Sequence, residues 1–335
     1  MRLSRGQNML VSEVVSQRNA LDFSQKDLEG VIFDIDRYAI HDGPGIRLLV
    51  FMKGCPLRCS WCCNPEGQNF SPEVAYFPAK CIGCGACIEV CPEKALRFQE
   101  GKLVTNWRIC RHCGRCVDRC YADARKLFGR TITVSALMEE VFKSIAFLTN
   151  SGGGITVGGG ELTGQATFVS NFLRSCKKEG LHTAIETCGY CTWGALSKVL
   201  EYADLVFYDV KHMNSKKHKT ATGVPNRRIL ENLKKVSTRP VDLVVRVPVI
   251  PEFNDDEENL SLMAEFIVSQ LNLSRFQMVE LLPYHKLGAF KYERLGRVYD
   301  LKSLEPPSDG KLHILRKIIE SYNIVCHVGG LNARS

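Results

Sequence analysis

Cysteine placement constrains this chain more than any other feature of its sequence. The 335 residues contain 16 cysteines, and most of them fall into three groups at short, regular spacings. Such a content would indicate disulfides in a small secreted protein. Residues 1–19 have no apolar run followed by a small-residue cleavage site, so we expect no secretory signal. In a chain of this size we interpret the grouped cysteines as metal ligands. The cysteines outside the groups are Cys63, Cys176, Cys188, Cys191 and Cys326.

Two of the groups are matching runs of four cysteines. Residues 81–92, CIGCGACIEVCP, and residues 110–120, CRHCGRCVDRC, share the spacing C-x2-C-x2-C-x3-C. This spacing is typical of bacterial two-cluster ferredoxins, in which the fourth cysteine of each run ligates the cluster of the other run. We therefore predict a ferredoxin-like unit with two [4Fe–4S] clusters over residues 73–128. The first cluster would take Cys81, Cys84, Cys87 and Cys120, and the second Cys110, Cys113, Cys116 and Cys91.

The third group lies in the loop 54–66, GCPLRCSWCCNPE, where Cys55, Cys59 and Cys62 have the spacing C-x3-C-x2-C. Three thiolates from one loop can ligate three irons of a [4Fe–4S] cluster and leave the fourth iron open to a small ligand. The alternative is structural zinc, with Cys63 as a fourth thiolate here and a pair of zinc knuckles in the two runs. Cys62 and Cys63 are adjacent and fit one tetrahedral site poorly, so we favour the cluster.

From residue 131 onward, short apolar runs alternate with amphipathic helical segments. A helix is expected over 135–148, with Ser135 as its N-cap. The other expected helices are 166–179, 193–201, 227–236, 257–271 and 308–321. The expected strands are 31–38, 47–52, 154–157, 182–186, 203–210, 242–250 and 276–282. This order predicts an α/β fold with a parallel sheet and crossover helices, with too few parallel strands for a closed eight-stranded barrel.

The loop 54–66 resembles the C-x3-C-x-aromatic-C signature of radical S-adenosylmethionine (SAM) enzymes. Its flanks resemble one branch, the activating enzymes of glycyl radical enzymes, in DGPGIR (42–47), GCPLRC (54–59), CNPE (63–66) and PYHKLG (283–288). The resemblance covers roughly residues 31–325. It implies a partial (β/α)6 TIM-like barrel with the ferredoxin-like domain inserted. The implied division is a polar extension at 1–30, barrel at 31–72, insert at 73–128 and barrel again at 129–335.

This resemblance implies an oxidoreductase with three [4Fe–4S] clusters. Its reduced loop cluster would cleave SAM to methionine and a 5′-deoxyadenosyl radical, which would take a Cα hydrogen from one glycine of a partner glycyl radical enzyme. A radical SAM enzyme acting on a small molecule or peptide is the first alternative, and a ferredoxin-like electron carrier is the second. We assign no catalytic side chain, because the cofactor carries the chemistry and the protein positions it.

The resemblance also implies which residues bind SAM. Most follow predicted strands, at the carboxyl ends where ligands bind in such folds. Trp61 would lie beside the adenine, Glu161 would accept the ammonium group, and Arg246 would meet the carboxylate. The implied cofactor-binding residues are Trp61, Cys62, Cys63, Gly159, Gly160, Glu161, Glu186, Thr187, Asp209, Val210, Lys211, Arg246 and His285.

Several of these residues have simpler interpretations. Asp209 and Lys211, in a D-x-K segment that the resemblance links to a monovalent cation, could form only an ion pair at a strand end. His285 could be structural, and Cys63 could be a spare thiol where relatives carry Ser or His. Asp42 could approach the target glycine, or could be a turn residue bonded to its own backbone.

The net charge and the hydropathy of the chain limit which kinds of partner we expect. The formal net charge is +8, but eleven thiolates against three cluster cores of charge +2 would add about −5, leaving roughly +3. We therefore expect no nucleic acid partner. No apolar run is long enough to span a membrane, so we expect no membrane association and a cytoplasmic location.

Residues 101–130 carry eight basic residues against Asp118 and Asp123, which predicts either charge compensation for the clusters or a docking face for an acidic flavodoxin or ferredoxin. The eight are Lys102, Arg108, Arg111, Arg115, Arg119, Arg125, Lys126 and Arg130.

Overall fold

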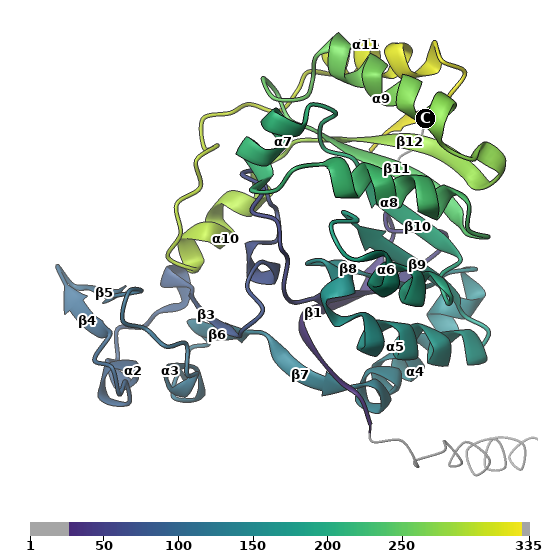
Figure 1. Cartoon of the computed structure of the whole chain (residues 1–335). Coiled ribbons are helices and arrows are strands. Elements are labelled where there is room, and N and C mark those ends of the chain that lie inside the picture. Colours follow the sequence, from purple (N-terminus) through teal and green to yellow (C-terminus); the bar gives the residue numbers. More distant parts are fainter. Residues whose placement is uncertain (1–26, 330–335) are drawn as a thin grey trace, which may run out of the picture.

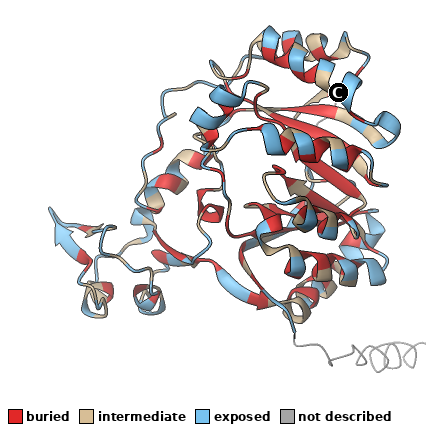
Figure 2. Ribbon diagram, in the orientation of Figure 1, coloured by how far each residue is buried: buried red, intermediate tan, exposed pale blue. Residues whose placement is uncertain are grey.

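A computed structural model describes residues 27–329 of the chain. The polar extension predicted for residues 1–30 therefore lies almost entirely outside the described residues. A large sheet with helices forms one part, and a small unit of short strands and helices projects from it (Figure 1). Buried residues gather along the sheet and on the helix faces against it, whereas exposed and intermediate residues predominate in the small unit (Figure 2).

The large sheet has nine strands in the order β13-β12-β11-β10-β9-β8-β2-β1-β7. From β2 to β13 all neighbours are parallel, whereas β1 pairs antiparallel with β2 and with β7. The strands are β1 Glu29–Ala39, β2 Arg47–Met52, β7 Arg130–Thr133, β8 Gly154–Gly159, β9 His182–Thr187, β10 Leu205–Asp209, β11 Asp242–Val249, β12 Phe276–Pro283 and β13 Cys326–Val328.

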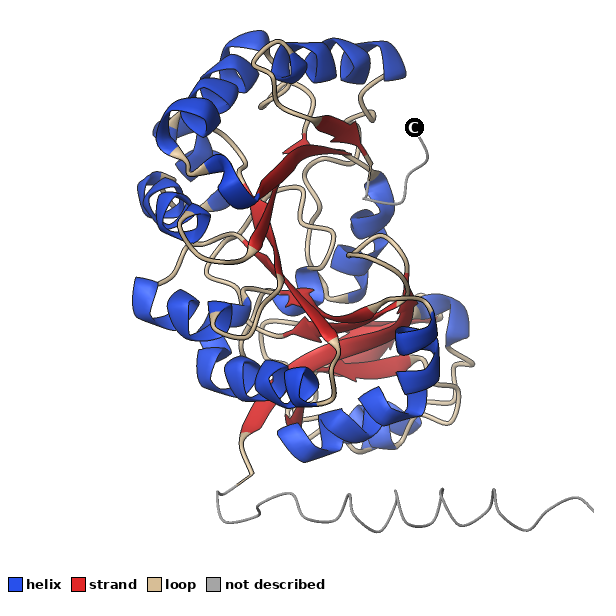
Figure 3. Ribbon diagram, turned by 90° about the vertical axis from the view of Figure 1, so that its right-hand side faces the viewer, coloured by secondary structure: helices blue, strands red, loops and turns tan. Residues whose placement is uncertain are grey.

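The prediction of a parallel α/β sheet that does not close is confirmed. The two end strands, β13 and β7, do not pair with each other, so the curved sheet stays an open barrel (Figure 3). Its six main parallel strands are β2 and β8 to β12, each of which lies where an apolar run predicted a strand. The short strands β7 and β13 were missed, because each has only three or four residues and owes its conformation to sheet pairing.

Helices cover the outer face of this sheet, and the core lies between the two layers (Figure 3). The strand residues Val157, Ile185, Val206, Val245 and Leu281 are fully or almost fully buried, as expected when both faces of a parallel sheet are covered. The helices are α4 Val134–Asn150, α5 Ala166–Lys178, α6 Trp193–Leu200, α7 Ser215–Thr222, α8 Arg227–Ser237, α9 Glu257–Gln270, α10 Ala289–Arg294 and α11 Asp309–Glu320.

Two details of the helix prediction were wrong. The N-cap of α4 is Thr133, whose side chain accepts a hydrogen bond from the backbone N–H of Ala136, and not Ser135. The short helices α7 and α10 were not predicted, because one is too polar and the other too short to show an apolar periodicity.

The small unit holds both cysteine runs. It contains the antiparallel pairs β3–β6 and β4–β5 and two single-turn helices, one within each run. Gly85 and Gly114 precede these helices with φ of 77° and 82°, a left-handed conformation that favours glycine. The elements are β3 Glu73–Tyr76, α2 Ala86–Glu89, β4 Leu96–Gln99, β5 Lys102–Thr105, α3 Arg115–Asp118 and β6 Arg125–Phe128.

A buried ionic network joins the small unit to the barrel. Glu73, at the start of β3, pairs with the fully buried Lys53 at 3.1 Å and also with Arg297 from the segment after α10. Arg297 Nη1 in turn donates to Pro65 O at 2.8 Å, near the end of the loop that carries Cys55, Cys59 and Cys62. The segment after α10 therefore fixes the insert and this loop against each other.

Candidate active site

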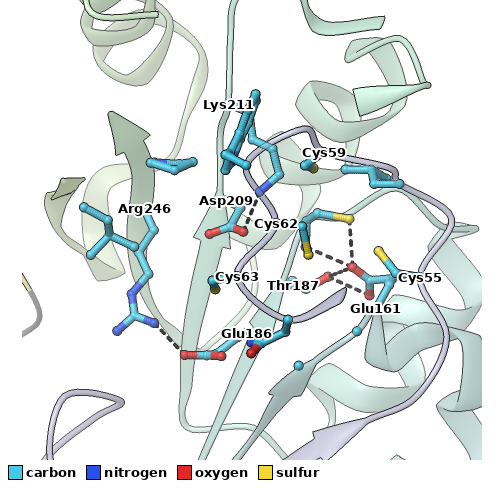
Figure 4. A pocket seen from close by; sticks show the side chains of 18 of the residues that line it. Cys55, Cys59, Cys62, Cys63, Glu161, Glu186, Thr187, Asp209, Lys211 and Arg246 are labelled. Carbon is cyan, nitrogen blue, oxygen red and sulfur yellow. Dashed lines mark hydrogen bonds and ion pairs between the residues drawn. The ribbon is translucent and has the colours of Figure 1, made fainter. Parts of the chain in front are cut away.

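A cavity of about 480 Å³ opens at the carboxyl ends of the parallel strands. Its volume lies within the roughly 300–1,000 Å³ typical of small-ligand pockets. Figure 4 shows side chains from the cysteine loop and from the ends of β8 to β11 converging on it. The predicted residues that line it are Cys55, Cys59, Trp61, Cys62, Cys63, Gly159, Gly160, Glu161, Glu186, Thr187, Asp209, Lys211, Arg246 and His285. Val210 is the exception, because its side chain is buried in the barrel core.

Backbone hydrogen bonds hold the cysteine loop in place. On one side, Cys55 N donates to Gln68 O at 3.0 Å. On the other, Arg58 N donates to Thr222 O at 2.7 Å and Ser60 N to Ala221 O at 3.1 Å, so the last carbonyls of α7 support the middle of the loop. Burial raises the pKa of Cys59 to about 12, so this thiol must lose a proton when it binds a metal.

An aromatic and glycine surface closes the cavity on the side of Trp61. The Trp61 ring is 9% exposed and packs against Phe253 with ring centroids 4.9 Å apart. The segment PYHKLG lies against the loop at Gly288, where an added Cβ would come within 3.0 Å of Cys62 O and Cys63 Cα. Glycine at this position therefore lets the segment carrying His285 approach the cysteines closely.

The Glu161 carboxylate is held by five donors from neighbouring residues. Its oxygens accept hydrogen bonds from Thr187 Oγ1 at 2.9 Å (Figure 4), and from Thr163 Oγ1 at 2.7 Å and Cys188 N at 2.9 Å. The backbone N–H of Thr163 at 3.2 Å and the Cys188 thiol at 3.0 Å complete the set. Such bonds fix the orientation of a buried carboxylate that also faces the cavity, where it can accept a ligand ammonium group.

Cys188 is a site residue whose contacts were not foreseen from the sequence, where it lay outside the three cysteine groups. It is 7% exposed, and its Sγ lies 3.0 Å from Glu161 Oε2. A hydrogen bond between the thiols of Cys188 and Cys55 lowers the pKa of Cys55 and raises that of Cys188. The only sequence signal was its position two residues after Glu186 at a strand end.

Lys211 brings a buried positive charge beside the cysteine loop. Its Nζ pairs with Asp209 Oδ2 at 2.7 Å, and the residue is 7% exposed. Burial lowers the pKa of Lys211, but the nearby Asp209 and Cys59 outweigh burial and raise it overall. The ammonium therefore stays charged where thiolates of a cluster would gather.

Arg246 lies between two carboxylates in the wall of the cavity. Its Nε donates to Glu280 at 2.7 Å, its Nη1 to Glu186 at 2.6 Å, and its Nη2 to His41 O at 3.0 Å. Burial raises the pKa of Glu186 to about 8, with Arg246 opposing this shift and Asp42 adding to it. These contacts use three of the five guanidinium N–H groups, and Nη1 also pairs with Asp42 Oδ1 at 3.8 Å.

Arg47, the last residue of DGPGIR, is a second residue that the sequence did not single out. It is fully buried, and its Nε donates to Thr156 Oγ1 at 3.0 Å. Thr156 Oγ1 donates in turn to Asp42 O at 2.6 Å, which fixes Asp42 at the cavity edge. Burial lowers the pKa of Arg47 to about 10.

In the small unit the eight cysteines gather around two further cavities. One is lined by Cys81, Cys84, Cys87 and Cys120, and the other by Cys91, Cys110, Cys113 and Cys116. The fourth cysteine of each run thus lies with the first three of the other run, as the ferredoxin spacing predicts. Backbone N–H groups of Ala95 and Ala124 point at Cys91 Sγ (3.3 Å) and Cys120 Sγ (3.2 Å).

These donor sets fit clusters better than single ions. Within residues 27–329, no group of three or more His, Cys, Asp or Glu side chains is placed to hold one metal ion. The thiols surround cavities instead, and the main cavity adds a carboxylate for an ammonium, an arginine for a carboxylate and an aromatic ring for a base. Among the described helices, none is long and apolar enough to cross a membrane.

The fold and the site define an iron–sulfur enzyme with an open α/β barrel. Comparison with known families agrees: residues 106–263 match the radical SAM superfamily, and residues 80–124 match the 4Fe–4S dicluster domain. The radical SAM match begins at residue 106 and so does not include the loop 54–66. In the sequence, the insert stands between this loop and the rest of the barrel.

Three relatives illustrate the similarity. The isethionate sulfite-lyase activating enzyme of Oleidesulfovibrio alaskensis is 42% identical over 82% of this chain and 90% of its own length. The (2S)-3-sulfopropanediol dehydratase activating enzyme of Klebsiella oxytoca is 40% identical over 90% and 97%. The trans-4-hydroxy-L-proline dehydratase activating enzyme of Clostridioides difficile is 39% identical over 90% and 99%. The chain belongs to the radical SAM activating enzymes of glycyl radical enzymes, an oxidoreductase family, and the electron-carrier alternative is set aside.

Proposed function

We propose that this chain activates its partner with three [4Fe–4S] clusters. The SAM-binding cluster would be held by Cys55, Cys59 and Cys62, and the two auxiliary clusters by the cysteine sets of the small unit. When bound and reduced, the first cluster supplies the electron that cleaves SAM to methionine and a 5′-deoxyadenosyl radical, which removes a Cα hydrogen from a glycine of the partner. The observation that carries this proposal is one cavity lined by the three loop cysteines, Glu161 and Arg246.

The side chains of the cavity bind and orient the cofactor. Glu161 accepts hydrogen bonds from the ammonium group of SAM, since Thr163 and Cys188 already donate to its carboxylate and hold it facing the cavity. The Arg246 guanidinium, which lines the cavity, binds the carboxylate, and Trp61, backed by Phe253, packs against the adenine. Lys211 offsets the negative charge of the cluster thiolates. A monovalent cation at Asp209 stays a prediction, because Lys211 already occupies one oxygen of that carboxylate.

The partner we propose is a glycyl radical enzyme whose glycine enters at the Asp42 side of the cavity. Arg47 and Thr156 fix Asp42 there, in the lining of the same cavity as the loop cysteines. The relatives that share about 40% identity activate a lyase and two dehydratases, so overall similarity favours no single partner. The test is electron paramagnetic resonance (EPR) of the partner after anaerobic incubation with this chain, SAM and reductant. We further propose a cytoplasmic location, where thiols stay reduced.

The small unit also carries the proposed docking face for an acidic electron donor. Seven of the eight basic residues of 101–130 are exposed. Reversing two of them, Arg111→Glu with Arg115→Glu, should slow reduction by flavodoxin about tenfold at low salt and flatten its salt dependence, because complementary charge speeds encounter. Stopped-flow absorbance would measure both effects.

The matched control reverses two exposed basic residues on α5, Arg174→Glu with Lys178→Glu, which changes the net charge equally on another face. It should leave flavodoxin reduction unchanged, and dithionite should reduce all the proteins alike. Equal slowing with both donors, or loss of iron, would mean that Arg111 and Arg115 serve the clusters and not docking.

A further inference from the structure

Arg125 is the one basic residue of 101–130 that the structure buries, which corrects its place in the predicted docking face. It lies at the start of β6, is 3% exposed, and lines both cysteine cavities of the small unit. Its Nη2 donates to Thr105 Oγ1 at 3.0 Å, and its guanidinium carbon lies 4.9 Å from the ring centroid of Tyr76, its cross-strand neighbour. A single guanidinium therefore lies between the two sets of four thiols.

Two buried nitrogens of Arg125, Nε and Nη1, have no oxygen or nitrogen acceptor among the described residues. The Cys87 thiol is a side-chain hydrogen-bond partner of Arg125. A buried charged donor left unpaired is costly, so such groups in a folded protein indicate a missing acceptor. Arg125 lines two cavities, and Cys87 lines one of them and Cys116 the other. The acceptors that would complete the arginine are therefore sulfur atoms.

A comparison of the two cysteine runs shows that the fold of the small unit does not require a charged residue at this position of each run. Leu96 follows Cys91 by the same five residues by which Arg125 follows Cys120. The preceding alanines, Ala95 and Ala124, make matching N–H contacts to the sulfurs of these cysteines. Leu96 is buried and apolar at 5% exposed. The pseudo-repeat thus fills one position with leucine and the other with a buried cation.

We propose that Arg125 donates hydrogen bonds to the sulfurs of both auxiliary clusters and raises both of their reduction potentials. An electron passed from the flavodoxin-type donor to a bound cluster would add negative charge, which the guanidinium and its N–H groups would stabilise. This inference rests on the proposed assignment of the two auxiliary clusters.

The experiment is an EPR-monitored redox titration of the full-length, cluster-loaded protein. The signal that changes on addition of SAM identifies the site cluster, and the other signals report the auxiliary pair. Arg125→Leu introduces the residue found at the matching position 96. It should lower the reduction potential of both auxiliary clusters by at least 59 mV, which is a tenfold change in the equilibrium constant for one-electron reduction. The site cluster should not shift. The control Arg111→Leu removes an exposed charge beside Cys110, and should shift the auxiliary potentials by less than half as much.

Arg125→Leu with full iron and unchanged potentials would overturn the proposal, as would a shift no larger than that of Arg111→Leu. If Arg125→Leu loses auxiliary iron, the variant Arg125→Lys provides the test. Its single ammonium cannot reach both clusters, so the reduction potential of at least one auxiliary cluster should fall. Two unchanged auxiliary potentials in Arg125→Lys would refute the proposal. Wild-type protein that shows no auxiliary signals refutes the cluster assignment itself, whatever the variants do.

Discussion

Replacing Cys59 with alanine should abolish SAM cleavage, to below about a thousandth of the wild-type rate, while about eight irons of the auxiliary pair remain. Cys59 lies in the middle of the loop, and its loss leaves two loop thiolates for the cluster whose open iron binds SAM. The small unit has its own thiols and its own hydrogen bonds, so it should keep its clusters. Chromatography of 5′-deoxyadenosine and iron analysis measure the two effects, without any partner present.

Two further cysteine variants serve as controls. Cys113→Ala should lose auxiliary iron yet retain some cleavage with a strong artificial reductant, because it leaves the loop intact. Cys176→Ala removes a buried thiol on α5 that lies in the hydrophobic core and contacts Met138, and should leave cleavage and iron unchanged. Full cleavage by Cys59→Ala would refute the assignment of the loop.

Arg246→Met should lower the free energy of unfolding by about 3–5 kcal/mol. The reason is Glu280, which is fully buried, pairs with Arg246 Nε, and has its other oxygen without a described partner. Without Arg246, Glu280 would be an uncompensated buried charge or would have to take up a proton. Anaerobic thermal unfolding would show the loss as a lower transition temperature.

The double variant Arg246→Met with Glu280→Leu separates stability from cofactor binding. Replacing both partners with apolar residues should restore most of the stability. SAM affinity should nevertheless stay weaker by about tenfold to a hundredfold, since a charge-assisted hydrogen bond contributes about 1.5–3 kcal/mol. If the stable double variant bound SAM as tightly as wild type, Arg246 would be a structural residue only.

Local patterns were enough to predict the parts of the molecule whose chemistry depends on spacing. The three cysteine groups could be found from their spacing alone, whereas Glu161, Glu186 and Asp209 at the strand ends were singled out through the family resemblance. The open parallel barrel also followed, since alternating strands and helices permit few topologies.

Residues whose role depends on tertiary contacts could not be found in this way. Arg125 stands among seven exposed basic residues, and only its pairing opposite Tyr76 reveals that it is buried. Arg47 is one of many arginines until Thr156 and the Asp42 turn are placed around it. Cys188 gains significance only when β9 brings it against Cys55. Val210, in contrast, was included because it lies between Asp209 and Lys211, although alternation along a strand end turns it into the core.

The central claim, that this chain makes a glycyl radical in a partner, is tested most directly by EPR. The chain, loaded with its clusters, is reduced anaerobically and mixed with SAM and its cognate glycyl radical enzyme. We expect a glycyl doublet in the partner, formed together with 5′-deoxyadenosine, and no doublet when Cys59→Ala replaces the wild-type chain. Robust formation of 5′-deoxyadenosine by the wild-type chain without a doublet in its cognate partner would contradict the claim.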